Sequence, residues 1–217
     1  MAALTLVIGN KNYSSWSLRP WLALRAAGLP FEEVLIPLYR SESKAQILRW
    51  SPSGKVPALV EGDSVTWDSL AICERAAELA PTAGLWPADA VARAFARSVS
   101  AEMHAGFMAL RTLCPCNLRL RANRPLTPEV EADVARIRSL WRECRERFGG
   151  SGEFLFGRFG IADAMYAPVV TRFRSWGVPI EDPVVRRYSG AVLDWPHFRE
   201  WEEAALQETE RIDSSEP

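Results

Sequence analysis

Hydrophobic positions change their spacing along the chain. Short apolar runs at 4–9 ("LTLVIG") and 31–38 ("FEEVLIPL") are typical of buried strands, and the segment between them has helical spacing that ends at Gly28 and Pro30. A crossover of this kind makes its two strands parallel. The following residues indicate a short helix at 42–50, two strands joined by a Gly-Asp hairpin, and a further helix. The first 80 residues therefore predict the order βαβαββα.

Strand patterns nearly disappear in the second half of the chain. Helical spacing is found there in four segments, residues 91–118, 127–147, 161–174 and 195–208. A segment rich in Pro, Gly and Ala separates the two halves. We predict an α/β domain at residues 1–80, a linker at 81–90 and an all-α helical bundle domain at 91–217. The polar end of the chain, residues 211–217, is expected to be frayed.

Composition narrows the class of partner. The chain has 217 residues, of which 48% are hydrophobic, and 26 basic residues nearly balance 27 acidic ones. This balance provides no overall field for nucleic acid or an acidic membrane, so small molecules are the expected partners. The first residues lack the pattern of a signal peptide, and no stretch reaches the ~18 apolar residues of a membrane helix. We expect a soluble, cytoplasmic protein.

Cysteine and histidine are scarce. The four cysteines form no C-x-x-C pair and no Cys/His cluster with zinc spacing, so we expect reduced, structural thiols. The only histidines, His104 and His197, leave little basis for a metal site or a Ser-His-Asp triad. The sequence predicts no metal and a chemistry that runs without histidine.

Serines gather where the first strand turns into the first helix, in "NYSSWSLRPWLAL" at 12–24. Proline is tolerated only near the start of a helix, so Pro20 indicates a helix that begins near Trp16 or Ser17. Ser14 and Ser15 then lie in the turn that faces the helix N-terminus, where free N–H groups favour an anion. The serines have two interpretations: ordinary helix caps, or a hydroxyl donor to a negatively charged ligand.

Two further polar turns lie in "SGKVPALVEGDSVTWDSLAI", residues 53–72. Val56-Pro57 stands between a Gly-containing turn and a strand, where a cis proline would expose the backbone of the preceding residue to a ligand. Asp68-Ser69 opens the third helix and presents a carboxylate beside free N–H groups. Each feature alone fits an ordinary turn or cap, but their combination in this element order favours a ligand site.

The chain at this point resembles the glutathione transferase family, in which a thioredoxin-like domain precedes an all-helical one. The resemblance rests on "NYSSWSLRPWLALRAAG", "SPSGKVPALVEGDSVTWDSLAICE" and "FGRFGIADAMYAP", in that order, and covers nearly the whole chain. "SSWSLR" is most similar to the serine-type zeta class, with Arg19 at a matching arginine. The resemblance implies a bacterial, cytoplasmic homodimer that uses glutathione as cosubstrate in detoxification.

The resemblance also implies roles for individual residues. Ser14 would be the catalytic hydroxyl, with Ser15 and Ser17 left to cap the backbone. The glutathione site would consist of Ser15, Trp16, Lys55, Val56, Pro57, Asp68 and Ser69. Val56 and Pro57 would pair with the cysteinyl backbone, Asp68 and Ser69 with the γ-glutamyl end, and Lys55 with the glycyl carboxylate.

A second substrate would lie between the domains. Helical spacing places His104, Met108 and Arg111 on one face at i, i+4 and i+7, which gives a candidate surface for it. The alternative is that Met108 belongs to the core and His104 to a solvated face. Arg119, Arg121 and Arg124 form a local basic cluster, for which a solvated face is favoured over nucleic-acid binding.

Two departures from the family pattern affect the interpretation. Trp16 occupies the place of the zeta-class cysteine, which weakens the case for maleylacetoacetate isomerase activity. Gly160 stands where a Ser or Thr usually caps the helix containing Asp163, so half of a capping box is missing and Asp163 is expected to be structural.

The main hypothesis is a glutathione transferase that ionises glutathione and transfers it to a small electrophile. The alternatives are a glutathione-dependent cis-trans isomerase of an unsaturated diacid, a non-catalytic ligand-binding protein, and a disulfide reductase. The last is disfavoured because the turn has hydroxyls where a redox protein needs thiols.

Overall fold

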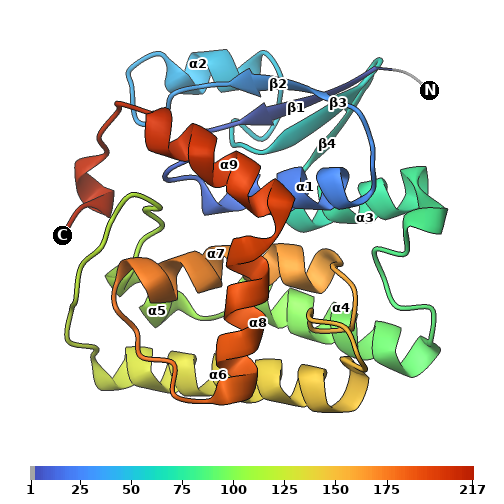
Figure 1. Ribbon diagram of the computed structural model, residues 1–217. Helices are drawn as coiled ribbons and strands as arrows, with labels where there is room; N and C mark the ends of the chain where they lie inside the picture. Colours follow the sequence, from blue (N-terminus) through green and yellow to red (C-terminus); the bar gives the residue numbers. More distant parts are fainter. Residues whose placement is uncertain (1–2) are drawn as a thin grey trace.

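The computed structural model describes residues 3–217 and has a small sheet at one end of a helical body (Figure 1). The elements of the first half are β1 (Leu4–Ile8), α1 (Ser15–Ala26), β2 (Glu32–Leu35), α2 (Ser43–Leu48), β3 (Ala58–Glu61), β4 (Ser64–Trp67) and α3 (Ser69–Leu79). The strand order is β2-β1-β3-β4, with β2 parallel to β1 and the other pairs antiparallel. The predicted thioredoxin-like order and the parallel β1–β2 crossover are confirmed.

Alternation along β1 explains how the sheet is covered on both faces. Leu6 and Ile8 join the main core with residues of α1 and α3, whereas Val7 packs on the other face with Ile47 of α2. The prediction of a buried second strand is wrong, because β2 lies at the edge of the sheet and Leu35 is 42% exposed.

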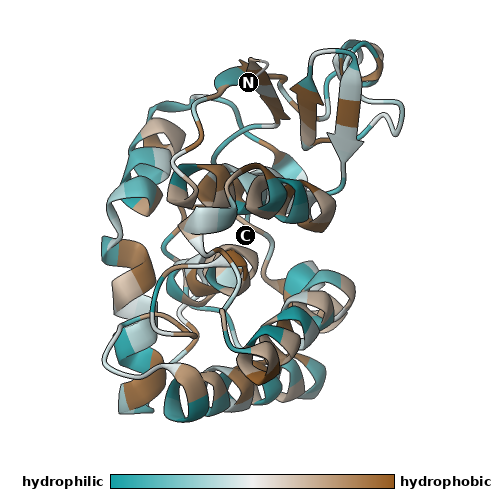
Figure 2. Cartoon of the chain, turned by 90° about the vertical axis from the view of Figure 1, so that its right-hand side faces the viewer, coloured by the Kyte–Doolittle hydropathy of each residue, from teal (hydrophilic) through white to brown (hydrophobic). Residues whose placement is uncertain are grey.

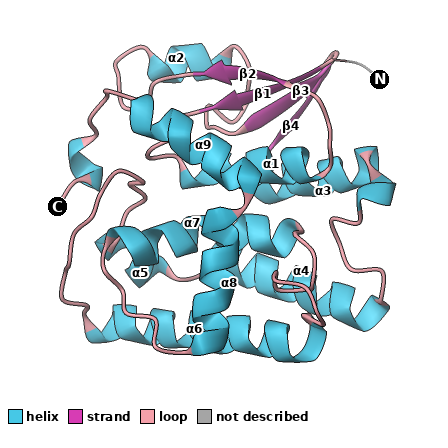
Figure 3. Cartoon of the chain, in the orientation of Figure 1, coloured by secondary structure: helices cyan, strands magenta, loops and turns pink. Residues whose placement is uncertain are grey.

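The second half is helical, as predicted (Figure 3). Its elements are a 3-10 turn η1 (Pro81–Ala83), α4 (Ala90–Ala105), α5 (Met108–Leu113), α6 (Pro128–Phe148), α7 (Ile161–Ser175), α8 (Pro183–Asp194), α9 (Pro196–Gln207) and a 3-10 turn η2 (Asp213–Ser215). Hydrophobic and hydrophilic residues alternate along most of these helices (Figure 2), as in helices that bury one side. Helix α7 is buried along almost its whole length and packs against α1 and α4, which joins the two halves.

Three expectations for this half need correction. The helical segment at 91–118 is broken, because α4 ends at Ala105 and Phe107 adopts a left-handed backbone with φ of 60°. Helix α8 was not predicted, although its start is marked by Asp182, which caps the helix, and by Pro183 at its first position. The end of the chain is not frayed, because the carboxylate of Glu216 accepts hydrogen bonds from the Tyr13 hydroxyl and the Asn117 amide.

Asp163 holds the loop before α7 in place. Its carboxylate is fully buried and accepts hydrogen bonds from the backbone N–H of Leu155, at 3.0 Å, and of Gly160, at 2.9 Å. Gly160 has no side chain to complete the reciprocal bond of a capping box. The structural role expected for Asp163 agrees with these contacts.

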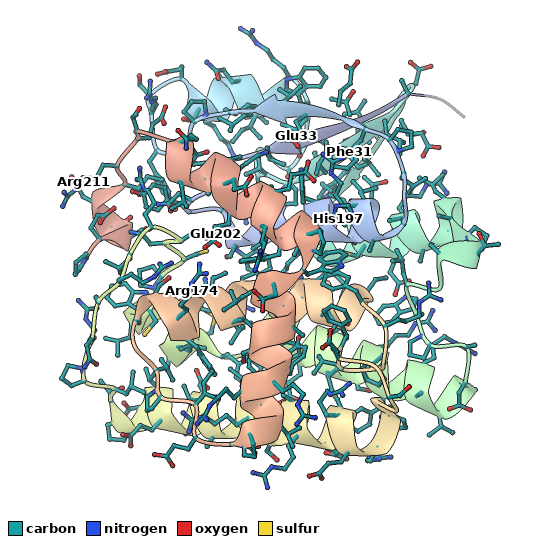
Figure 4. All side chains as sticks on the ribbon, viewed as in Figure 1. Phe31, Glu33, Arg174, His197, Glu202 and Arg211 are labelled. Atoms are coloured by element: carbon teal, nitrogen blue, oxygen red, sulfur yellow. The ribbon has the colours of Figure 1, made fainter. Side chains whose placement is uncertain are left out.

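Helix α9 returns to the first half of the chain. Trp201 is fully buried, and its ring meets that of Trp21 on α1 edge to face, with 5.3 Å between centroids. Arg174 on α7 and Glu202 on α9 point toward one another and form an ion pair (Figure 4). The last helix thus contacts both halves and leads the chain end toward the turn before α1. Within residues 3–217, no helix is long and apolar enough to cross a membrane.

Candidate functional site

A cleft of about 530 Å³ lies over the N-termini of α1 and α3. Its lining residues are Trp16, Ser53, Lys55, Val56, Pro57, Trp67, Asp68 and Ser69. Six of these were chosen from the sequence, and the fold brings them together from three separate segments. Ser53 and Trp67 were not chosen, although each neighbours a chosen turn. The Val56-Pro57 peptide bond is cis.

Ser14 is the N-cap of α1 and lies beside the cleft, not among its lining residues. The helix begins at Ser15, slightly earlier than Pro20 indicated. The Ser14 hydroxyl accepts a hydrogen bond from the Ser17 N–H at 3.3 Å and donates to Ser17 Oγ at 2.8 Å. The assignment of Ser15 and Ser17 to capping is therefore wrong, because Ser14 itself caps the helix. Its side chain occupies the positive end of the helix dipole, where an anion is favoured.

The other two serines have separate partners. Ser17 Oγ accepts a hydrogen bond from the backbone N–H of Gly9 at 3.1 Å, which ties the first turn of α1 to the end of β1. Ser15 Oγ accepts one at 3.3 Å from the guanidinium of Arg172, on α7. Of the three serines, only Ser14 caps the helix. Its hydroxyl proton is donated to another side chain, that of Ser17, and not to the backbone.

Three guanidiniums lie close together behind this turn, those of Arg19, Arg111 and Arg172. Every hydrogen bond that they make within residues 3–217 goes to a backbone carbonyl or a hydroxyl, and the two terminal nitrogens of Arg19 have no acceptor there. Burial, followed by the charges of Arg111 and Arg172, lowers the pKa of Arg19 to about 9. Arg19 therefore keeps its charge at neutral pH, and the cluster adds positive potential behind the serines. Sequence reasoning missed Arg172, which lies 157 residues from Ser15.

Trp16 connects the cleft to the helical half. Its indole is 36% exposed on the cleft side, and the guanidinium carbons of Arg19 and Arg111 lie 4.3 and 4.8 Å from its ring centroid. The ring of His104, near the end of α4, approaches the indole edge on at 5.4 Å. His104 and Arg111 therefore reach the border of the cleft through Trp16.

Asp68 and Ser69 form the other polar end of the cleft. One carboxylate oxygen of Asp68 caps α3 by accepting the Leu70 N–H at 2.9 Å, and the other lies 3.2 Å from His104 Nε2. Asp68 holds a positive φ of 79°, uncommon for a residue other than glycine. The buried hydroxyl of Ser69 has no hydrogen-bond partner within residues 3–217. This end thus offers a carboxylate and a free hydroxyl to a ligand.

The common helical face proposed for His104, Met108 and Arg111 is wrong. The helix break at residues 106–107 separates His104 from the other two, and Met108 is 63% exposed at the start of α5. Arg111 folds back so that its guanidinium donates to the backbone carbonyls of Met103 and His104, which end α4. The i, i+4, i+7 spacing therefore runs across two separate helices, α4 and α5, and does not define one face.

The described residues 3–217 contain no group of three or more His, Cys, Asp and Glu side chains that could hold a metal ion. All four cysteines are free and buried. Burial raises the pKa of each thiol, and that of Cys144 reaches about 12. None of them is therefore suited to act as a thiolate nucleophile at neutral pH.

Comparison with known proteins agrees with this architecture. Residues 13–79 match the family model "Glutathione S-transferase, N-terminal domain", and residues 127–204 match "Glutathione S-transferase, C-terminal domain". Together the two matches span more than half of the chain, and every residue that lines the cleft lies in the first of them. The chain belongs to the glutathione S-transferase family.

Individual relatives are distant. The chain is 28% identical over 196 residues to glutathione S-transferase 1 of Dianthus caryophyllus, covering 86% of each chain. It is 33% identical over 157 residues to a zeta-class glutathione S-transferase of Euphorbia esula, covering 70% of this chain and 66% of the relative. Among solved structures, a glutathione transferase homolog from Burkholderia GL BGR1 with bound glutathione superposes with a TM-score of 0.71 at 24% identity, over 96% of this chain and all of that one. That likeness shows the shared fold.

Proposed function

We propose that the protein is a glutathione transferase. It would bind glutathione in the cleft, ionise the thiol of the peptide and transfer the glutathionyl group to a small electrophile. The observation that carries the proposal is the convergence of three features on one cleft. These are the backbone at Val56-Pro57, the polar pair Asp68-Ser69, and the N-terminus of α1 capped by Ser14 in front of three guanidiniums. Glutathione offers a matching peptide backbone, two charged ends and a thiol.

The thiol chemistry needs only a modest electrostatic contribution. A thiol with a pKa of about 8.5 requires a depression of about 1.5 units to be half ionised at neutral pH, or roughly 2 kcal/mol. A hydrogen bond to a charged acceptor supplies about 1.5 to 3 kcal/mol, and a helix N-terminus adds roughly 0.3 to 1. In the proposed mechanism the Ser14 hydroxyl exchanges its bond to Ser17 Oγ for one to the sulfur. The nearby guanidiniums strengthen the same effect, so the thiol proton passes to solvent and no general base is required.

The electrophile would enter between the two halves of the chain. Trp16 lines the cleft and touches His104 and Arg111, so these three side chains border the space beside the thiol. The exposed indole offers an apolar surface, and Arg111 offers positive charge. Met108 is left out of this surface because its side chain is largely exposed to solvent, whereas the Arg111 guanidinium packs on Trp16.

The alternative reaction is the glutathione-dependent cis-trans isomerisation of an unsaturated diacid of the maleylacetoacetate type. It is supported by the similarity to a zeta-class relative and weakened by Trp16 in the place of the class cysteine. Conjugation of a chlorinated aromatic electrophile and isomerisation of a maleyl compound, assayed in parallel, distinguish the two reactions. Retained glutathione binding with neither activity would instead support a non-catalytic binding protein.

Glutathione is expected to raise the melting temperature in a concentration-dependent way. A ligand bound only by the folded state stabilises that state by mass action, and a hundredfold excess over Kd contributes about 2.7 kcal/mol. Differential scanning fluorimetry with millimolar glutathione measures the shift, and S-methylglutathione serves as a non-ionisable comparison. The absence of any shift with both peptides would remove the basis of the proposal.

Replacement of Asp68 is expected to weaken glutathione binding while leaving the pKa of the bound thiol almost unchanged, because Asp68 faces the far end of the peptide. Asp68→Asn keeps an oxygen for the α3 cap, whereas Asp68→Ala also loses about 1 kcal/mol of stability with the cap. Isothermal titration calorimetry gives the affinity. Asp63→Ala, in the exposed β3–β4 turn, is the control. A large change in thiol pKa would contradict this division of roles.

A further inference from the structure

Residues 10–13, which lead directly into Ser14, form the catalytic turn of the proposed mechanism. The backbone N–H of Ser14 donates to the Asn10 carbonyl at 2.8 Å, and that of Tyr13 donates to the same oxygen at 3.1 Å. The position of the Ser14 hydroxyl is therefore set by the shape of this turn. Few of the remaining polar groups of the turn bond to one another, so their partners must come from elsewhere in the chain.

Those partners come from the end of the chain. Glu208, just past α9, accepts the Lys11 N–H on one carboxylate oxygen at 2.6 Å and the Asn12 N–H on the other at 3.0 Å. The Tyr13 hydroxyl donates to Glu216 Oε1 at 2.6 Å. Consecutive residues of the turn are thus held by carboxylates that lie about 200 positions later in the sequence.

Arg119 holds the chain end against the turn from the second side. Its guanidinium donates to the Tyr13 hydroxyl at 2.8 Å and to the backbone carbonyls of Glu208 and Glu210. Its backbone N–H donates to the fully buried Asn12 side chain at 2.9 Å. Figure 1 shows the chain end, in red, running beside the loop that precedes α6. Arg119, grouped by sequence with solvated arginines, is therefore part of this network.

We propose that residues 208–216 form a carboxyl-terminal clasp that positions the catalytic turn, with Glu208, Glu216 and Arg119 as positioning residues for the Ser14 hydroxyl. The proposal rests on the proposed function, because it concerns the geometry of thiol activation. Apart from Trp16, the residues that line the cleft lie in two other segments, at 53–57 and 67–69, and no hydrogen bond joins these segments to the clasp. Loosening the clasp should therefore affect thiol ionisation and kcat much more than the KM for glutathione.

The direction in which the pKa of the bound thiol moves distinguishes a positioning role of the clasp from a direct effect of its charges. Removal of a negative charge near the site would by itself favour the thiolate and lower the thiol pKa. Displacement of the Ser14 hydroxyl has the opposite effect, because the thiolate loses a donor. A rise in thiol pKa after removal of Glu208 therefore reports a misplaced donor.

The test is the thiolate absorbance of bound glutathione against pH, together with steady-state kinetics, in Glu208→Ala. We expect the thiol pKa to rise by about half a unit to one unit and kcat below that pKa to fall about three- to tenfold, with the KM for glutathione within about twofold of the parent. Glu203→Ala, an exposed position on α9, should match the parent. Glu216→Gln, which keeps an acceptor for Tyr13, should stay near the parent, whereas Glu216→Ala should shift in the same direction as Glu208→Ala.

A folded Glu208→Ala with an unchanged or lowered thiol pKa would overturn the clasp, as would a KM effect with unchanged kcat. If Glu208→Ala does not fold, the same thiol titration and kinetics of Tyr13→Phe test the clasp, because this substitution removes one hydroxyl and no charge. A parent protein that binds no glutathione would instead refute the proposed function, so the two failures are distinguishable.

Discussion

Asp163→Ala is expected to destabilise the protein by about 2 to 6 kcal/mol, because it leaves two buried N–H groups, those of Leu155 and Gly160, without acceptors at roughly 1 to 3 kcal/mol each. A loss of this size is a large fraction of the stability of a typical folded protein. For a chain of this length, at about 2 to 4 °C per kcal/mol, such a loss lowers Tm by about 4 to 24 °C. Urea unfolding and differential scanning fluorimetry at about pH 8 measure it.

Asp163→Asn provides the matched control and adds a dependence on pH. Burial raises the pKa of Asp163 from 3.8 to about 7, against the pull of the two N–H donors. A raised folded-state pKa stabilises the fold most below 3.8, and this contribution is lost as the pH rises toward 7. The stability advantage of the parent over Asp163→Asn should therefore shrink between about pH 4 and about pH 7. Parent-like stability of Asp163→Ala would show that other contacts hold the loop at 155–160.

Ser14→Ala is expected to raise the pKa of the thiol of bound glutathione by roughly one to two units. The substitution deletes the hydroxyl assigned to the thiolate, and with it about 1.5 to 3 kcal/mol of thiolate stabilisation. Binding should persist, since the peptide contacts proposed for Val56 and Asp68 do not involve this hydroxyl. Thiolate absorbance against pH measures the shift. The variant also loses its N-cap, so Tm should fall by an amount that corresponds to about 1 kcal/mol.

The neighbouring serines supply controls with different expected results. Ser17→Ala leaves the buried Gly9 N–H without its acceptor and frees the Ser14 proton, so it should reduce stability without raising the thiol pKa. Ser15→Ala removes an acceptor of Arg172 and should change the titration only slightly. If Ser15→Ala carried the large shift and Ser14→Ala titrated like the parent, the hydroxyl beside the sulfur would be Ser15.

Local patterns were sufficient to predict most of the fold and the cleft. The period of the hydrophobic residues identified every strand and most helices, and the turns at Val56-Pro57 and Asp68-Ser69 could be recognised because capping and proline geometry act over a few residues. The same locality explains the failures. The break after Ala105 depends on a left-handed Phe107 that no spacing rule anticipates, and α8 was overlooked despite its Asp-Pro start.

Contacts between distant segments could not be found in this way. Arg172 reaches Ser15 from α7, and Glu208 reaches the backbone of Lys11 from beyond α9. Neither residue has a local sequence pattern that distinguishes it from a solvated charged residue. The contacts of both residues form only when α7 and α9 pack against α1. For the same reason the exposure of β2 was missed, because a strand shows no sign in its own sequence that it will lie at the edge of the sheet.

The most direct test of thiol activation is the pH titration of glutathione bound to the unmodified protein, followed by thiolate absorbance at saturating peptide. We expect the bound thiol to titrate at least about 1.5 units below its ordinary pKa of about 8.5, so that half or more is ionised at neutral pH. A bound thiol that titrates like free glutathione would contradict the account, because the cleft would then bind the peptide without activating it.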